Sequence, residues 1–357
     1  MLEENTLFAH RYRLVKRLGQ GAFSEVWKAE DTKAGSMVVA LKIYAPDKGM
    51  DEDGVKMFSS EFTLVFNVSH KNLLTPSYYD DYNGSPYLVL PFCEQGSAQR
   101  RIGLMDEREM AKFLFDVSGA LAFLHAQHPP IIHQDIKPEN ILNDNGVYML
   151  SDFGVSTHVK PLLNHLTGMT GSLKEAGTLD YMAPERFSKD KVPIMSNDIW
   201  SLGATIYELL TMELPFVMGG LTQANGEKIP HLKGSYSPLL KQIIEDCMIL
   251  ETWKRPRAEQ LYEVARSVLE GHPVPDPLPW KEPDDENDAD TLPPPSPSAN
   301  DGSETAGDVE DERKPADDDD KWPEPPQIVV PDTKISKTYI AVLAVAGAAI
   351  GVLLALI

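Results

Sequence analysis

Asp135, Lys137 and Asn140 lie close together in the stretch IIHQDIKPEN, which runs from residue 131 to residue 140. A carboxylate can accept a proton from a hydroxyl group, a lysine can neutralise a phosphoryl group in transfer, and an asparagine oxygen can hold a metal ion. A polar loop after a buried strand would have a similar composition. The catalytic interpretation goes further, because it requires phosphate-binding and metal-binding partners elsewhere in the chain.

Two upstream stretches could supply groups that bind phosphate. In LGQGAFSEVWKAE, residues 18–30, apolar and polar residues alternate around Gly19 and Gly21. This pattern predicts a hairpin whose glycine-rich tip lets backbone amides approach a phosphate. In MVVALKIY, residues 37–44, Lys42 interrupts an apolar strand, and a buried charge needs a partner. Glu61, in the amphipathic stretch VKMFSSEFTLVFNV, is the candidate partner, although it could also be an ordinary solvated helix charge.

Two downstream stretches could complete the site. Asp152 follows an apolar strand in VYMLSDFGVS and precedes Phe153 and Gly154, where a carboxylate could hold a cation. SNDIWSLGATIYELL, residues 196–210, is almost wholly apolar around Asp198. We expect this stretch to form a buried helix in which Asp198 accepts hydrogen bonds near the first turn.

Taken in order, these stretches and GTLDYMAPE, residues 177–185, resemble the eukaryotic-like (Hanks-type) serine/threonine protein kinase family. Asn140 comes five residues after Asp135, and Asp152 comes seventeen after it. The combination of order and spacing is far more specific than any single motif. Over residues 12–271 the resemblance implies an α+β, bilobal protein kinase fold, with a small β-rich N-lobe and a larger, mainly helical C-lobe.

The resemblance implies a nucleotide site for ATP. Lys42 would bind the α- and β-phosphates and pair with Glu61. Leu90–Cys93 would form the hinge that reads adenine through backbone groups. Further contacts to the nucleotide would come from Ala40 and from the glycine-rich loop, which comprises Leu18, Gly19, Gln20, Gly21, Ala22, Phe23, Ser24, Glu25 and Val26.

The resemblance also implies roles for the groups around the transferred phosphoryl. Asp135 would accept or orient the proton of the substrate hydroxyl, and Lys137 would neutralise the γ-phosphoryl group. Asn140 and Asp152 would hold Mg²⁺, with Mn²⁺ as an alternative metal. In a structural role, Glu185 would pair with Arg255 from WKRPRAEQL.

Four residues refine the comparison with the family. Lys137 together with Thr178 resembles the serine/threonine branch, so we expect protein substrates bearing serine or threonine. Ser24 stands where a third glycine is usual, and the first two glycines make the closest approach to phosphate. Gln134 stands where most members have an arginine that clamps a phosphate on the activation loop. Glutamine carries no charge, so we expect this mode of control to be lost.

Two other functions fit part of the sequence. A pseudokinase scaffold or signalling adaptor would share the fold, but such proteins usually lack the strand lysine, the loop aspartate or the metal-binding aspartate, all of which are present here. A kinase of small molecules is disfavoured by the stretches ending in APE and DIWSLG, which belong to the protein-substrate branch.

The composition separates a folded domain from an acidic tail. The formal net charge is −21, of which residues 272–333 carry −15 and the remaining residues −6. This window also contains 14 of the 28 prolines and almost no apolar periodicity, which predicts a disordered linker. The acidic balance and the absence of a Lys/Arg cluster in the sequence argue against nucleic-acid binding. Cys93 and Cys247 show neither metal-site spacing nor a disulfide framework.

The last residues predict a membrane anchor. Residues 339–357 carry no charge, and a helix of this length would be about 28 Å long, close to the thickness of a bilayer core. We therefore expect a transmembrane helix at 338–357, and Lys334 and Lys337 before it favour a kinase domain facing the cytoplasm. Gly347 and Gly351 lie on one face of that helix, where they could mediate a homodimer, although a span rich in alanine and glycine can contain this pattern by chance.

Overall fold

The computed structural model describes residues 2–20, 24–44, 68–152, 179–188, 192–232 and 234–281. All of them belong to one compact unit, residues 1–295. Gly21, Ala22, Phe23, Glu61 and the expected span at 338–357 lie outside the described residues, as does the chain beyond Lys281. Within the described ranges, no helix combines the length and apolar character needed to cross a membrane.

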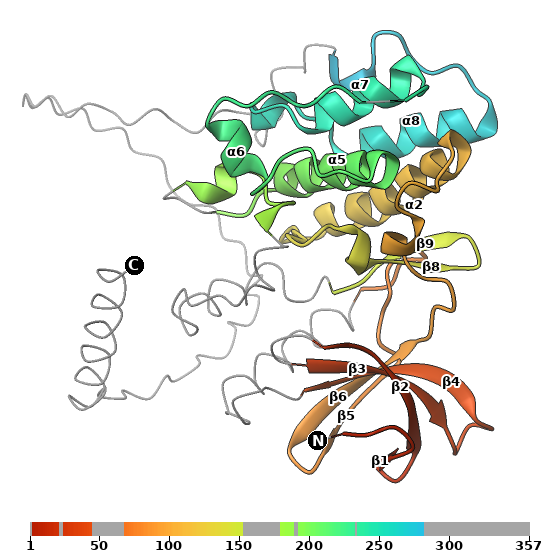
Figure 1. Ribbon diagram of the computed structural model, residues 1–357. Coiled ribbons are helices and arrows are strands. Elements are labelled where there is room, and N and C mark those ends of the chain that lie inside the picture. The colour runs from red at the N-terminus through yellow and green to blue at the C-terminus, as the bar shows by residue number, and fades with distance from the viewer. Residues whose placement is uncertain are drawn as a thin grey trace, which may run out of the picture. The chain divides into compact units, whose positions relative to one another are not determined.

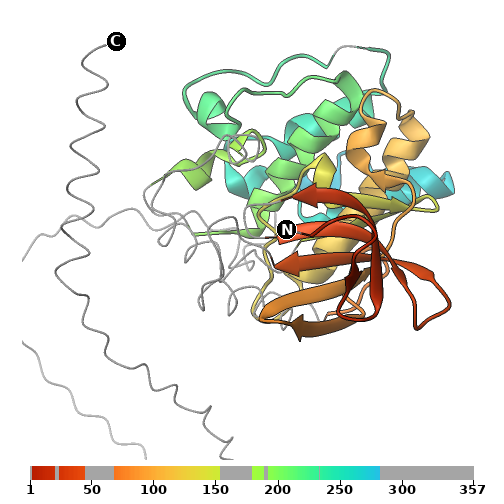
Figure 2. The same cartoon turned by 60° about the horizontal axis from the view of Figure 1, so that its bottom comes forward.

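The N-terminal part is a six-stranded antiparallel sheet with strand order β1-β2-β3-β4-β6-β5 (Figures 1 and 2). The strand expected from MVVALKIY is β4, and the expected glycine-rich hairpin consists of β2 and β3, whose tip lies outside the described residues. The sheet comprises β1 (Leu7–Phe8), β2 (Tyr12–Gln20), β3 (Ser24–Asp31), β4 (Met37–Tyr44), β5 (Tyr78–Tyr82) and β6 (Ser85–Pro91).

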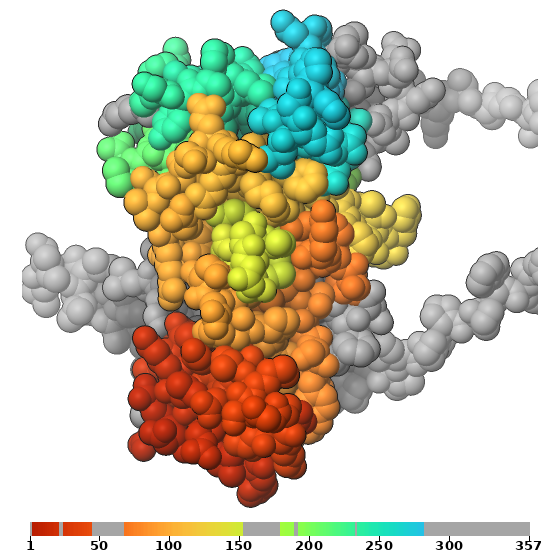
Figure 3. All heavy atoms as spheres, turned by 90° about the vertical axis from the view of Figure 1, so that its right-hand side faces the viewer, coloured from red at the N-terminus to blue at the C-terminus, as the bar shows by residue number. Residues whose placement is uncertain are grey.

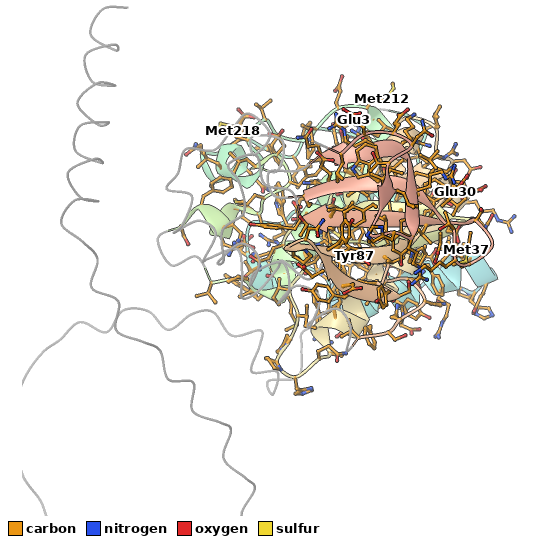
Figure 4. All side chains as sticks on the ribbon, turned by 90° about the horizontal axis from the view of Figure 1, so that it is seen from below. Glu3, Glu30, Met37, Tyr87, Met212 and Met218 are labelled. Carbon is orange, nitrogen blue, oxygen red and sulfur yellow. The ribbon has the colours of Figure 1, made fainter. Side chains whose placement is uncertain are left out.

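Alternation along the strands gives this sheet two different faces. Trp27, Leu41 and Val89 belong to the apolar cluster on one face. Tyr87, labelled in Figure 4, joins that cluster through an edge-on contact with Phe8, their ring centroids 5.1 Å apart. The residues that alternate with them on β4, including Lys42, point to the other face, so the sheet sorts its core from its polar positions.

A second sheet of three short strands contains the β8–β9 hairpin, which leads to Asp152. Strand β7 (Gly96–Ser97) pairs with β8 (Ile141–Asp144), which pairs with β9 (Val147–Leu150). Leu150 donates its amide to the carbonyl of Asn72 at 2.9 Å, and Leu74 donates to the carbonyl of Leu150 at 2.8 Å. Figure 3 shows the β8–β9 hairpin in yellow-green, with earlier segments of the chain in orange around it. These bonds fix the end of β9, immediately before Asp152.

Four helices form the larger core (Figure 1): α2 (Glu107–His125), α5 (Met195–Thr211), α7 (Pro238–Cys247) and α8 (Ala258–Glu270). Helix α2 packs on α8, and α5 packs on α7. Thirteen of the 17 residues of α5 are buried, including Asp198, which confirms the expected buried helix. A helix that is apolar on every side is stable only where neighbours surround it. The remaining short elements are α6 (Gly220–Ala224) and the 3₁₀ helices η1 (Ala98–Arg101), η2 (Pro138–Asn140), η4 (Pro184–Phe187), η5 (Thr252–Lys254) and η6 (Pro279–Lys281).

The folded domain extends about ten residues beyond the expected boundary at Gly271. Leu278 is buried in the helical core, and Val274 packs against it. Trp280 donates its indole N–H to Oδ2 of Asp246 at 2.8 Å, while Lys281 Nζ lies 2.6 Å from Oδ1 of the same carboxylate. The expectation of a disordered linker from His272 is therefore wrong for residues 272–281. Four of these ten residues are prolines, yet a few anchored side chains are enough to hold the segment on the domain.

Truncation should reveal this extension. A chain ending at Lys281 should unfold with the same free energy as a chain ending at residue 295, because both keep the anchoring contacts. A chain ending at Gly271 should lose about 2–4 kcal/mol, since it exposes the apolar surface under Leu278 and leaves the buried carboxylate of Asp246 without its lysine and indole partners. Urea unfolding followed by circular dichroism measures the difference. Equal midpoints for the chains ending at 271 and 281 would contradict the extension.

Candidate active site

The backbone around Asp135 is held by one buried carboxylate. Asp198, in the first turn of α5, accepts the amide of His133 at 2.8 Å and the amide of Gln134 at 2.7 Å. Nε2 of His125, from the end of α2, lies 2.9 Å from the same carboxylate. Burial is the largest single effect and raises the pKa of Asp198. The hydrogen bond and the charge of His125, together with other nearby donors, outweigh burial, so the pKa of Asp198 lies below its ordinary value. Three elements therefore meet at one ionised side chain.

Gln134 and His133 hold the backbone in an unusual conformation. Gln134 has a φ of +64°, in the left-handed region that a non-glycine residue rarely adopts. Nδ1 of His133 accepts the amide of Asp135 at 3.3 Å, so Nε2 carries the ring proton and donates to the carbonyl of Ser151 at 3.0 Å. Left-handed residues of this kind are characteristic of sites where the surrounding contacts over-determine the backbone.

The three residues of the opening motif converge as the sequence predicts. Lys137 Nζ lies 3.1 Å from Oδ2 of Asp135. Asn140 Nδ2 donates to Oδ2 of Asp135 at 2.8 Å and to its backbone carbonyl at 2.9 Å. Because its amide nitrogen is used in this way, Oδ1 of Asn140 is the atom that can serve a metal ion. A base, a cation and a neutral oxygen ligand thus share one turn of chain.

Lys42 and Asp152 form an ion pair between the sheet and the end of β9. Lys42 Nζ lies 2.7 Å from Oδ1 of Asp152. The charge of Lys42 lowers the pKa of Asp152, and the neighbouring Asp135 acts in the opposite sense, which places the two carboxylates in one electrostatic environment. Asp152 also adopts a left-handed φ of +60°. The expected pairing of Lys42 with Glu61 involves a residue outside the described ranges, so it stays a prediction.

The residues expected around the nucleotide mostly share one face of the sheet. Ala40 pairs with Leu90 across β4 and β6, and Val26 pairs with Lys42 across β3 and β4. Glu25 differs: its side chain points to the other face, is buried, and accepts the indole N–H of Trp27 at 2.8 Å. The glutamate alternates with Val26, so strand geometry places only its backbone near a nucleotide.

The other residues expected at the nucleotide lie at the ends of β2 and β3 and in the expected hinge. Leu18, Gly19 and Gln20 form the end of β2, and Ser24 begins β3. Cys93 is buried, and burial raises the pKa of its thiol to about 11, so the hinge cysteine is an inert packing residue. Cys93 and Cys247 are both free thiols.

The pair expected between Glu185 and Arg255 is present. Arg255 donates from both terminal nitrogens to the two carboxylate oxygens of Glu185, at 2.7 and 3.0 Å, and its side chain is fully buried. Asn197 donates a further hydrogen bond to the same carboxylate. The pair attaches η4 to the helical core, which confirms the structural role that the sequence suggested.

A tight glycine contact positions the segment before Glu185. Gly219 has a φ of +55°, and a Cβ there would lie 2.3 Å from the carbonyl oxygen of Leu179. The next residue, Gly220, donates its amide to the carbonyl of Met182 at 2.8 Å. Side chains at these two positions would push residues 179–184 away from α6, so the glycines fix the approach of that segment.

Arg186 is a site residue that the sequence analysis did not identify. Its Nη2 donates to Oε1 of Gln134 at 2.9 Å, across 52 residues of chain. The uncharged side chain of Gln134 thus has a guanidinium from η4 against it. The expected loss of control through a phosphate on the activation loop stays a prediction. Arg186 directly follows the APE stretch, and no spacing rule connects it to the catalytic loop.

Known proteins with similar sequences assign the family. Residues 12–265 match the family model described as "Protein kinase domain". The chain belongs to the protein kinase family. It is 26% identical over 262 residues to a probable serine/threonine-protein kinase, PknB, of Lactococcus lactis, covering 71% of this chain and 40% of the relative. It is 35% identical over 209 residues to an Aurora kinase of Schizosaccharomyces pombe, covering 57% of this chain and 56% of the relative.

A second Aurora kinase, from Yarrowia lipolytica, is 30% identical over 261 residues, which cover 71% of this chain and 67% of the relative. The match thus spans 40% and 56% of the first two relatives' own lengths. The similarity lies in the kinase domain, which is the part that carries Asp135, Asn140 and Asp152.

The Glu185–Arg255 pair generates a stability prediction. Glu185→Ala should lower the unfolding free energy by about 3–5 kcal/mol, because it leaves a fully buried guanidinium without its counter-charge. The matched control is Glu263→Ala, which breaks an exposed pair with Arg266 and should cost about 0–1 kcal/mol. Chemical denaturation measures both variants. Equal losses would show that Arg255 does not depend on Glu185.

Proposed function

We propose that this chain is a serine/threonine protein kinase that transfers the γ-phosphoryl group of ATP to hydroxyl groups of proteins. The observation that carries the proposal is the arrangement of Asp135, which is flanked by Lys137 and Asn140 and shares its electrostatic environment with the Lys42–Asp152 pair. Family membership and relatives named as serine/threonine kinases support it.

The residues divide the reaction between them. Asp135 accepts the proton of the substrate hydroxyl as that oxygen bonds to the γ-phosphorus. The bond from the γ-phosphorus to the β–γ bridging oxygen breaks, and ADP leaves with those electrons. Lys137, 3.1 Å from Asp135, carries the positive charge that offsets the charge on the phosphoryl group in transfer. The proton then passes from Asp135 to solvent.

The metal-binding residues fit a hard divalent cation. Asp152 offers a carboxylate that Lys42 keeps ionised, and Asn140 offers its amide oxygen, as Mg²⁺ prefers. Held by these two residues, Mg²⁺ would supply positive charge that neutralises part of the phosphate charge, and Mn²⁺ would have the same protein ligands. Two protein ligands are enough, because Mg²⁺ completes its shell with phosphate oxygens and water.

A pseudokinase scaffold is the alternative function. The residues that such proteins usually lack are all present, and Lys42, Asp135 and Asp152 lie in an arrangement suited to catalysis. Residues that are kept in the strained left-handed conformation, such as Gln134 and Asp152, are costly for a scaffold, which needs only the fold.

Replacing the strand lysine should separate these functions. Lys42→Met should reduce phosphoryl transfer to a generic protein substrate to the level of Asp135→Asn, because the ammonium that orients the phosphates is gone. Lys16→Met, an exposed lysine of β2, is the control and should leave transfer unchanged. A melting curve for each variant excludes loss of fold. Wild-type activity in folded Lys42→Met would refute the kinase assignment.

We further propose that the domain is tethered to a membrane through residues 338–357, with the kinase domain on the cytoplasmic side. The support is the uncharged stretch at 339–357 and the lysines that precede it. The acidic, proline-rich sequence between Lys281 and this stretch would act as a spacer.

Deleting residues 339–357 should release the enzyme into the soluble fraction with unchanged turnover on a soluble peptide. The spacer would separate the domain from the bilayer and leave the active site unaffected. Fractionation after a high-salt wash, followed by an activity assay, measures both properties. A truncated protein that still sediments with membranes would contradict the anchor.

The same stretch suggests a homodimer. Gly347 and Gly351 lie four residues apart, so one helix face would carry both and allow a second span to approach closely. Gly347→Ile combined with Gly351→Ile should then lower both crosslinked dimer and autophosphorylation in membranes. Unchanged dimer would indicate that the pattern arises from composition alone.

A further inference from the structure

Arg186 lies against the catalytic loop without belonging to it. Its guanidinium donates to Oε1 of Gln134 at 2.9 Å, and Gln134 immediately precedes the proposed base Asp135. Arg186 itself comes from η4, whose Glu185 is attached to the helical core by the buried Arg255. The contact therefore links a rigidly attached turn to the residue beside the base.

Gln134 is held from two sides. Its backbone amide donates to Oδ1 of the buried Asp198 at 2.7 Å, and its side-chain oxygen accepts from Arg186 at 2.9 Å. Between these contacts the residue keeps its left-handed φ of +64°. A non-glycine residue adopts this region only where its surroundings maintain it. Relaxation at Gln134 would turn the next peptide and with it the carboxylate of Asp135.

The charges around Arg186 favour a cation at this place. The carboxylates of Asp198, from α5, and of Glu185, from η4, both stabilise the guanidinium, while partial burial lowers its pKa. A partly desolvated arginine is costly, and a neutral amide oxygen alone would not offset that cost. The two carboxylates offset part of that cost, and the hydrogen bond to Oε1 orients the guanidinium toward Gln134.

We propose that Arg186 is a positioning residue that maintains the active conformation of the catalytic loop through its hydrogen bond to Gln134. The inference rests on the proposed kinase function, because its consequence is the placement of Asp135 for proton transfer. The loop thus obtains from η4 a guanidinium that its own sequence lacks. Arg186 touches no reacting atom and acts through Gln134.

A charge swap tests this arrangement in the full chain. Arg186→Gln should lower kcat by about ten- to a hundredfold, the effect of losing a charged hydrogen bond that fixes the base. Gln134→Arg should lower it similarly, because two guanidinium groups would then compete for one place. The double variant restores one guanidinium and one amide oxygen, so its kcat should return to within about threefold of wild type, a non-additive result expected of directly contacting residues.

The Michaelis constants distinguish positioning from binding. KM for ATP and for the protein substrate should stay within about twofold of wild type in all three variants, since a misplaced base affects the chemical step. The matched control is Arg266→Gln, an exposed arginine of α8 paired with Glu263, which should leave kcat unchanged. If Arg186→Gln does not fold, Gln134→Leu removes the acceptor and should show the same loss of kcat.

Each outcome has one meaning. A folded Arg186→Gln or Gln134→Leu with wild-type kcat would overturn the proposal, and so would a double variant in which the two losses simply multiply. A raised KM for the protein substrate at unchanged kcat would make Arg186 a substrate contact and also overturn it. Failure of the proposed function would be distinct, because the wild-type chain would then transfer no more phosphoryl than Asp135→Asn.

Discussion

The buried carboxylate of Asp198 organises the active site. It receives two consecutive backbone amides of the catalytic loop and the imidazole of His125, so α5, α2 and the loop meet at one charge. Burying a carboxylate costs several kcal/mol unless hydrogen bonds compensate it. The amides of His133 and Gln134 compensate the burial of Asp198. The same two amides precede Asp135 in the chain, so their position determines where the carboxylate of Asp135 lies. The stability of the helical core and the geometry of the base therefore depend on the same bonds.

A second constraint connects the sheet to this centre. Lys42 lies on β4, an interior strand of the sheet, and forms an ion pair with Asp152, which follows β9. Strand β9 is in turn fixed by the backbone of Asn72, while His133 bonds the carbonyl of Ser151. The carboxylate of Asp152, which we propose as a metal ligand, is thus positioned by the sheet, by the hairpin and by the catalytic loop together. Such over-determination explains how two left-handed residues, Gln134 and Asp152, persist in the site.

The sequence predicted those parts of the structure that follow from local pattern. Alternation of apolar and polar residues identified the β2–β3 hairpin, and an apolar stretch interrupted by Lys42 identified β4. An almost unbroken apolar stretch around Asp198 identified α5 as a buried helix. The proximity of Asp135, Lys137 and Asn140 could be predicted from their spacing, because six residues of chain can place three side chains in only a few ways. The Glu185–Arg255 pair, 70 residues apart, came from the family resemblance, and the structure confirms it.

Other features depend on tertiary contacts that have no local signature. The Arg186–Gln134 bond joins two positions whose proximity follows from the packing of η4 on α6 and from the attachment of Glu185 to Arg255. Glu25 was expected near the nucleotide as part of a motif, but strand alternation turns its side chain to the core face. Residues 272–281 have the composition of a linker, yet Leu278, Trp280 and Lys281 attach them to the domain. Composition describes an average, and a few anchored side chains can outweigh it.

Asp198 holds the proposed base Asp135 in place through the amides of His133 and Gln134. The turnover number of an Asp198→Asn variant is the direct test of this role. An asparagine preserves the size of the side chain but presents an amide N–H₂ to a backbone donor, so one of the two loop amides loses its acceptor. We expect the Asp198→Asn protein to fold and to bind ATP, with a kcat lower by about a hundredfold because its catalytic group is displaced. A folded Asp198→Asn variant with kcat within about threefold of wild type would contradict it.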